Sequence, residues 1–124
     1  MSTSVETIID EPSVEKKVID EYFRLSKSYI EKYGPKTITL YQVGNFYEVY
    51  GYRDPQFPNT LQGSLIDLYS DVCSLRVAER NLLYKKKYSV SIAGFTTHPY
   101  QLEKYKEILL DNDFTVVIYI EEKD

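Results

Sequence analysis

The chain contains no tryptophan, one cysteine, one histidine and no long apolar run. The single cysteine, Cys73, cannot form a disulfide within the chain, and its apolar surroundings favour a core position. No paired cysteines or histidines have zinc-ligand spacing, so we expect a reduced, intracellular, soluble protein without a metal or cofactor. No segment approaches the length of a transmembrane helix or resembles a signal peptide, so we expect no membrane partner. The compartment stays open.

Motifs typical of enzymes are missing as well. The sequence has no glycine-rich phosphate loop, no G-x-S-x-G and no H-E-x-x-H. The lone His98 favours helix capping over catalysis, and the spacing of Asp67 and Asp71 favours a solvent-exposed helix face over a metal site. We therefore expect no catalytic residue. One alternative stays open, a small nuclease that uses Glu48 and Asp54 with a metal ion.

The charge is unevenly distributed. The 124 residues include 19 acidic and 15 basic side chains, a net charge of -4, but the acids gather at the two ends. Residues 76–87 carry a net charge of +4, with tyrosines between the basic residues. Basic and aromatic residues in one stretch are typical of nucleic-acid contact, although a solvated turn is the alternative. The candidates for contact with a DNA backbone are Arg76, Arg80, Lys85, Lys86 and Lys87.

Hydrophobic periodicity predicts one α/β (α+β) domain over residues 14–122, after a flexible lead-in of residues 1–13. We expect a mixed β-sheet flanked by about three helices. The first helix starts near Pro12 and ends at Gly34, and Ser64 is the expected N-cap of the second. The second and third helices are predicted at 64–75 and 100–111. The predicted strands are 37–43, 46–52, 76–81, 88–95 and 114–120, the last of them buried. Residues 53–63 are predicted to be a loop.

Gly44 and Asn45 form a turn signal between the first two predicted strands. Phe46 follows the tip directly, and Tyr47 points to the opposite face of the strand, where we expect it in the core. An exposed Phe46 would need a partner to cover it.

Tyr41 to Glu48 resembles the G-D-F-Y-E signature of the N-terminal mismatch-recognition domain (domain I) of the MutS family of DNA mismatch repair proteins. Residues 78–81, Ala-Glu-Arg-Asn, lie where the family has T-K-R-G/N, and residues 93–98 are similar to its A-G-I-P-Y-H. The blocks keep the family's order, and the resemblance covers residues 14 to 122. Asn45 replaces the usual aspartate of the signature.

The resemblance implies a MutS domain I-like fold and a site for mismatched DNA. In the family the phenylalanine enters the minor groove and stacks on the mispaired base, and the glutamate bonds to that base; by position these are Phe46 and Glu48. The implied partners are double-stranded DNA with mismatches or small loops, the rest of a MutS-type protein and its dimer partner.

ATP and magnesium would belong to family domains that this chain lacks, so we expect an excised domain, a fragment or a stand-alone relative without ATPase activity. A third alternative is a protein-interaction module that has lost DNA recognition and makes contact through its tyrosines.

Overall fold

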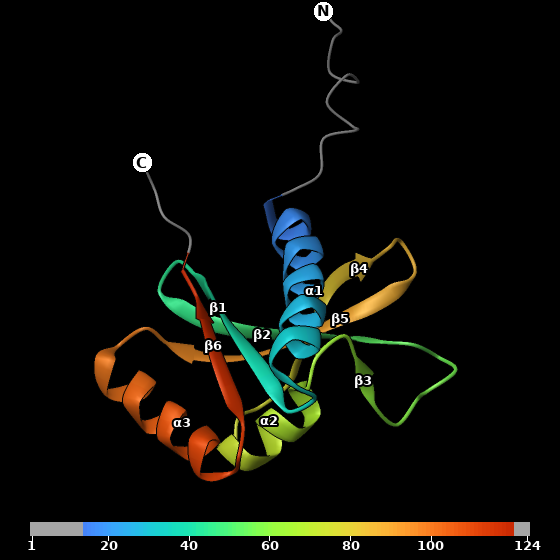
Figure 1. Ribbon diagram of the computed structural model, residues 1–124. Coiled ribbons are helices and arrows are strands. Elements are labelled where there is room, and N and C mark those ends of the chain that lie inside the picture. The colour runs from blue at the N-terminus through green and yellow to red at the C-terminus, as the bar shows by residue number, and fades with distance from the viewer. Residues whose placement is uncertain (1–13, 121–124) are drawn as a thin grey trace, which may run out of the picture.

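The computed structural model describes residues 14–120, which form three helices and a six-stranded sheet (Figure 1). The predicted α+β class with a mixed sheet is confirmed. None of the helices in this range is long and apolar enough to cross a membrane. The helices are α1 (Val14–Tyr33), α2 (Ile66–Cys73) and α3 (Pro99–Asp111). The strands are β1 (Thr37–Val43), β2 (Phe46–Arg53), β3 (Leu61–Gln62), β4 (Ala78–Tyr84), β5 (Tyr88–Thr96) and β6 (Thr115–Tyr119).

The strand order is β4-β5-β2-β1-β6, and β3 pairs with β2 outside this path. β1 and β6 run parallel, and the other pairs are antiparallel. In the central pair, Phe46 lies opposite Thr96 at one end, and Arg53 lies opposite Ser89 at the other. At about 3.3 Å per residue, β2 separates these two ends by roughly 23 Å.

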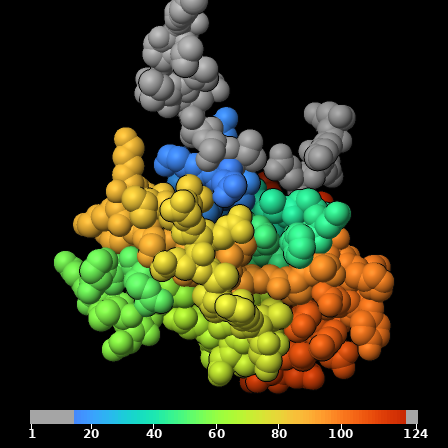
Figure 2. Space-filling model, turned by 180° about the vertical axis from the view of Figure 1, so that it is seen from behind, coloured from blue at the N-terminus to red at the C-terminus, as the bar shows by residue number. Residues whose placement is uncertain are grey.

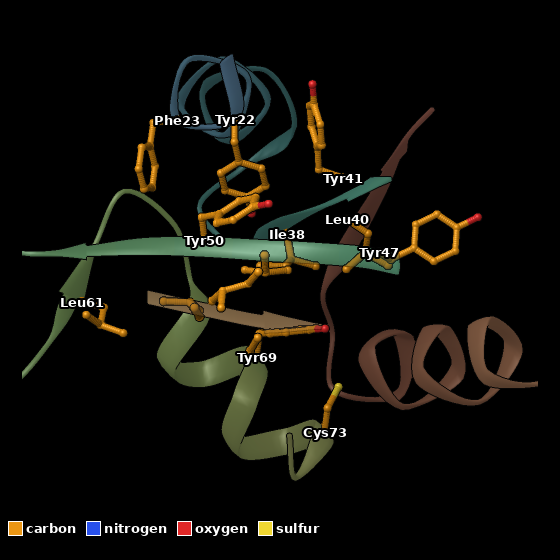
Figure 3. Close-up of a cluster of buried hydrophobic side chains, with 14 of the residues drawn as sticks. Tyr22, Phe23, Ile38, Leu40, Tyr41, Tyr47, Tyr50, Leu61, Tyr69 and Cys73 are labelled. Carbon is orange, nitrogen blue, oxygen red and sulfur yellow. The ribbon is translucent and has the colours of Figure 1, made fainter. Parts of the chain in front are cut away.

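Helix α1 packs on one face of the sheet through aromatic side chains (Figure 3). Tyr22 is fully buried, and its ring meets the edges of Tyr41 at 6.1 Å and Tyr50 at 5.2 Å. Its hydroxyl donates to the carbonyl oxygen of Thr39 at 2.9 Å. Edge-to-face ring pairs and a satisfied phenol explain why tyrosine is tolerated at the centre of this layer.

The opposite face of the sheet is covered by α2 and α3 (Figures 1 and 3). Phe95 of β5 contacts Tyr47 at 5.7 Å and Tyr105 of α3 at 4.6 Å. Tyr69 and Cys73 of α2 are buried. The core positions predicted for Tyr47 and Cys73 are therefore confirmed. Most tyrosine and phenylalanine rings of the described residues pack in or against the core.

Several local predictions are confirmed. The first two strands have the predicted bounds within one residue, and α1 ends before Gly34, whose φ of +120° suits glycine alone. His98 caps α3, because its Nδ1 accepts a hydrogen bond from the Tyr100 amide at 3.1 Å. The predicted start at Pro12 and the predicted lead-in of residues 1–13 lie outside the described residues.

Other expectations were wrong. The final strand is not buried: β6 pairs only with β1 at the end of the strand order, so its side chains stay partly exposed. A short strand, β3, interrupts the expected loop, and β4 continues to Tyr84. The expected Ser64–Asp67 capping pair does not form, because the Asp67 carboxylate accepts from the Leu61 amide at 2.7 Å. Ser64 is not the N-cap of α2 as predicted, because the helix begins at Ile66 and its N-cap is Leu65, but the Ser64 hydroxyl accepts from the Ile66 amide at 3.2 Å.

Candidate nucleic-acid interface

Phe46 stands at the tip of the β1–β2 hairpin. Gly44 has a φ of +59° in the two-residue turn, and Val43 pairs with Phe46 directly after it. The Phe46 side chain is 48% exposed. The Thr97 amide donates to the carbonyl oxygen of Asn45 at 2.9 Å, which ties the turn to the segment before α3. Phe46 is therefore exposed, on a turn that a hydrogen bond ties to the segment after β5.

Glu48 lies on the same face of β2 as Phe46, two residues further along the strand. Tyr47 between them points into the core on the other face. In the sheet, the neighbours of Glu48 are Tyr41 of β1 and Gly94 of β5. Gly94 contributes no side chain beside Glu48, and Glu48 is partly exposed.

The Tyr50 hydroxyl donates a hydrogen bond to the Glu48 carboxylate. Burial raises the pKa of Tyr50 well above its ordinary value, and the bond to Glu48 raises it further, so Tyr50 remains a donor at neutral pH. The sequence analysis missed this contact. The spacing contains its signal, because residues two apart on a strand share a face.

The three lysines that connect β4 and β5 lie at the end of the sheet opposite to Phe46. Lys85 and Lys86 have φ values of 53° and 58°, and the Lys87 amide donates to Tyr84 at 3.1 Å, which closes a tight turn. The turn follows the register to the Arg53 end of β2, roughly 23 Å from the Phe46 end. The structure does not bring the predicted lysines and the predicted base contacts together.

The two arginines of the basic stretch lie at different distances from Phe46. Ala78 pairs with Ile92, which pairs with Tyr50, so Arg76 before it reaches toward the Phe46 end of the sheet. Arg80 pairs with Val90, which pairs with Tyr52, so it lies near the lysine end of β2. It forms an exposed ion pair with Glu15 at 3.6 Å. Of the five basic candidates, Arg76 lies nearest to Phe46 along the strand direction.

A groove of about 580 Å³ opens between α1 and the loop before α2, a feature that the sequence analysis missed. The rings of Phe23, Tyr52 and Tyr84 line it together with Lys85, so it belongs to the lysine end of the sheet. Phe57, 55% exposed, stands in the loop after β2, beyond the same end of that strand. Figure 2 shows the loop after β2 and the β4–β5 turn as neighbouring projections.

The carboxylates of the alternative nuclease site are far apart. Glu48 and Asp54 are separated by most of the length of β2, roughly 20 Å, which is too far for one metal ion to bridge. Within residues 14–120, no group of three or more His, Cys, Asp or Glu side chains is placed to hold a metal ion. The predicted surface positions of Asp67 and Asp71 are confirmed.

No protein-family model matches the chain, and no curated protein matches its sequence. The resemblance to the MutS family therefore rests on the ordered sequence blocks alone.

Proposed function

We propose that this chain is a non-catalytic DNA-binding domain of MutS type that senses mispaired or unpaired bases. Phe46 enters the minor groove as an apolar wedge and stacks on the displaced base, and Glu48 bonds to that base. A wedge must unstack a base step at a cost of a few kcal/mol, which is least at a mismatch, so discrimination comes from the deformability of the duplex.

The observation that carries this proposal is the exposed Phe46 ring beside the hairpin turn. The other aromatic residue of the motif, Tyr47, is buried in the core, whereas the ring of Phe46 is exposed to solvent. An exposed aromatic ring on a braced turn is organised before binding, which lowers the ordering cost of inserting it. Glu48 on the same face reaches the same side of an inserted base.

Contacts with the DNA backbone are proposed in two groups. Arg76 lies toward the Phe46 end of the sheet, where it can steady a duplex held at the wedge. Arg80 lies level with Tyr52, near the other end of β2, and is grouped with the lysines. Lys85, Lys86 and Lys87 reach such a duplex only where it continues along the sheet, roughly 23 Å away. We therefore assign these lysines general attraction to DNA rather than mismatch sensing.

The test is a binding titration at low salt. It compares a homoduplex with the same duplex carrying one G·T mispair or one unpaired base, for the wild type and for Phe46→Ala. Phe57→Ala is the matched control, since Phe57 is exposed to a similar extent and lies in the loop beyond the other end of β2. We expect the wild type and Phe57→Ala to prefer the defective duplexes and Phe46→Ala to lose that preference.

Equal binding of the wild type to all duplexes would contradict the proposal. A preference that survives in Phe46→Ala would place recognition elsewhere and would also contradict it.

A further inference from the structure

We propose that Tyr50 is a positioning residue that holds Glu48 as a hydrogen-bond acceptor, and that the site consequently favours displaced thymine and guanine. These two bases carry a ring imino N–H that can donate to a carboxylate. The inference rests on the function proposed above and names the class of base that this site selects.

The Tyr50 hydroxyl is itself held firmly. Tyr50 is 5% exposed, and its ring packs on Tyr22 of α1 at a centroid distance of 5.2 Å. Its carbonyl oxygen accepts from the Ser64 hydroxyl at 2.5 Å, so its backbone is tied to the loop before α2. A donor fixed on both its ring and its backbone can set the orientation of the flexible Glu48 side chain (Figure 3 shows Tyr50 beneath α1).

The other neighbours of Glu48 leave that orientation to Tyr50. Gly94 contributes no side chain on the β5 side. On the β1 side, the Tyr41 hydroxyl donates to Glu21 of α1. None of the ion pairs among residues 14–120 includes Glu48. The hydrogen bond from the hydroxyl of the buried Tyr50 therefore orients the Glu48 carboxylate.

The chemistry of the pair determines which base fits. A phenol donates and a carboxylate accepts, so Tyr50 occupies Oε1 of Glu48 and leaves Oε2 to accept from the base. Thymine and guanine offer an imino N–H at the ring position where cytosine and adenine have a lone pair. At that ring position, an acceptor facing a carboxylate leaves both groups without a donor, which is unfavourable once water is excluded, so adenine and cytosine would have to turn an exocyclic amino group toward Glu48 instead.

The experiment uses duplexes that differ in one unpaired nucleotide, either thymine or N3-methylthymine, in which a methyl group replaces the imino hydrogen. The variant is Tyr50→Phe, which removes one oxygen and keeps the ring against Tyr22. Tyr52→Phe is the matched control, since Tyr52 shares the strand and the face. We expect the wild type and Tyr52→Phe to prefer thymine, and Tyr50→Phe to lose roughly threefold to tenfold of that preference.

A second variant, Glu48→Gln, tests the same hydrogen-bonding role if Tyr50→Phe folds poorly. In Glu48→Gln, the Tyr50 hydroxyl can hold the amide oxygen, which leaves the amide N–H groups facing the base. We expect this variant to shift its preference from unpaired thymine toward unpaired adenine, whose ring nitrogen accepts.

Three results would overturn the inference. An unchanged thymine preference in Tyr50→Phe would mean that Tyr50 does not position Glu48, although a wedge that depends on Phe46 would leave the proposed function standing. Tighter binding of both duplexes by Tyr50→Phe would mean that Tyr50 keeps the Glu48 carboxylate away from the base instead of presenting it. A wild type that fails to distinguish an unpaired thymine from a homoduplex would overturn the proposed function and the inference together.

Discussion

A Cβ atom on Gly94 would lie 2.4 Å from the carbonyl oxygen of Tyr47 on the neighbouring strand. Real side chains do not approach backbone so closely, so β2 and β5 can keep their spacing here only with glycine. The same Cβ would lie 3.3 Å from the Cα of Glu48, which pairs with Gly94. Gly94 therefore sets the position of the backbone that carries the candidate base contact.

The first prediction concerns this glycine. Gly94→Ala should lower the free energy of unfolding by about 1–3 kcal/mol, because backbone on the facing strand must move to admit the methyl group. Urea unfolding measures this loss, and Ser89→Ala on the same strand is the control without a new contact. An unfolding free energy equal to that of the wild type would show that the sheet absorbs the methyl group without cost.

The second prediction concerns the basic turn. Replacing Lys85, Lys86 and Lys87 together with glutamine should weaken binding to homoduplex and mismatched duplex by the same factor and flatten the salt dependence. The turn lies at the opposite end of β2 from Phe46, so the ratio between the two duplexes should stay unchanged.

Titrations at several salt concentrations measure both quantities. The control replaces Lys27, Lys32 and Lys104, three exposed lysines on helices. If the basic turn takes part in mismatch sensing, the ratio between the duplexes will fall with the affinity.

The third prediction concerns the backbone of the same turn. Lys85 and Lys86 both adopt positive φ angles, which suit asparagine and glycine far better than lysine. Lys85→Asn combined with Lys86→Gly should raise the free energy of unfolding by about 1–2 kcal/mol, because the left-handed conformation costs glycine little. Thermal unfolding checks this, with Lys87→Gly as the control at a position of negative φ. A double variant that is less stable than the wild type would contradict the prediction.

The hairpin at residues 37–53 was predictable because its signals are local. Alternating apolar residues and a glycine turn lie within one short stretch, so the bounds of both strands were predicted to within one residue. The edge position of β6 was not predictable, because an apolar run such as Val116 to Ile118 looks the same whether one or two strands flank it.

The fourth prediction concerns alkaline pH. Burial raises the pKa of the Cys73 thiol to about 11, and burial also raises the pKa of Tyr22, Tyr50 and Tyr69 above 10.0. The folded chain holds these protons more tightly than the unfolded chain, so unfolding releases protons and stability falls as the pH rises. The contribution of Cys73 is fully present below pH 9 and is lost as the pH rises from 9 to about 11.

Urea unfolding between pH 8 and pH 11 measures this fall. In Cys73→Ala, the loss of unfolding free energy between pH 9 and 11 should be smaller. The loss that comes from the tyrosines, which begins near pH 10, should remain. A stability that is constant up to pH 11 in the wild type would contradict the prediction.

The separation of the lysine turn from Phe46 illustrates what a linear pattern hides. Residues 76–87 and 44–51 come together only through β5, and the direction of β5 decides which end of β4 faces the hairpin tip. The Tyr50–Glu48 bond is the opposite case, since two residues on one strand face already indicate it. Local pairs can be found from spacing, whereas the distance between two sites depends on strand order.

The parallel pairing of β6 with β1 also has a consequence for how the chain folds during synthesis. Thr37 lies opposite Thr115, and the ring of Tyr41 stacks on Tyr119 at 4.8 Å. At typical rates of translation, residue 115 follows residue 37 by roughly 4 to 16 s. For that interval β1 lacks β6, its parallel partner within residues 14–120, so the backbone hydrogen-bonding groups on that edge of the nascent hairpin are accessible to chaperones.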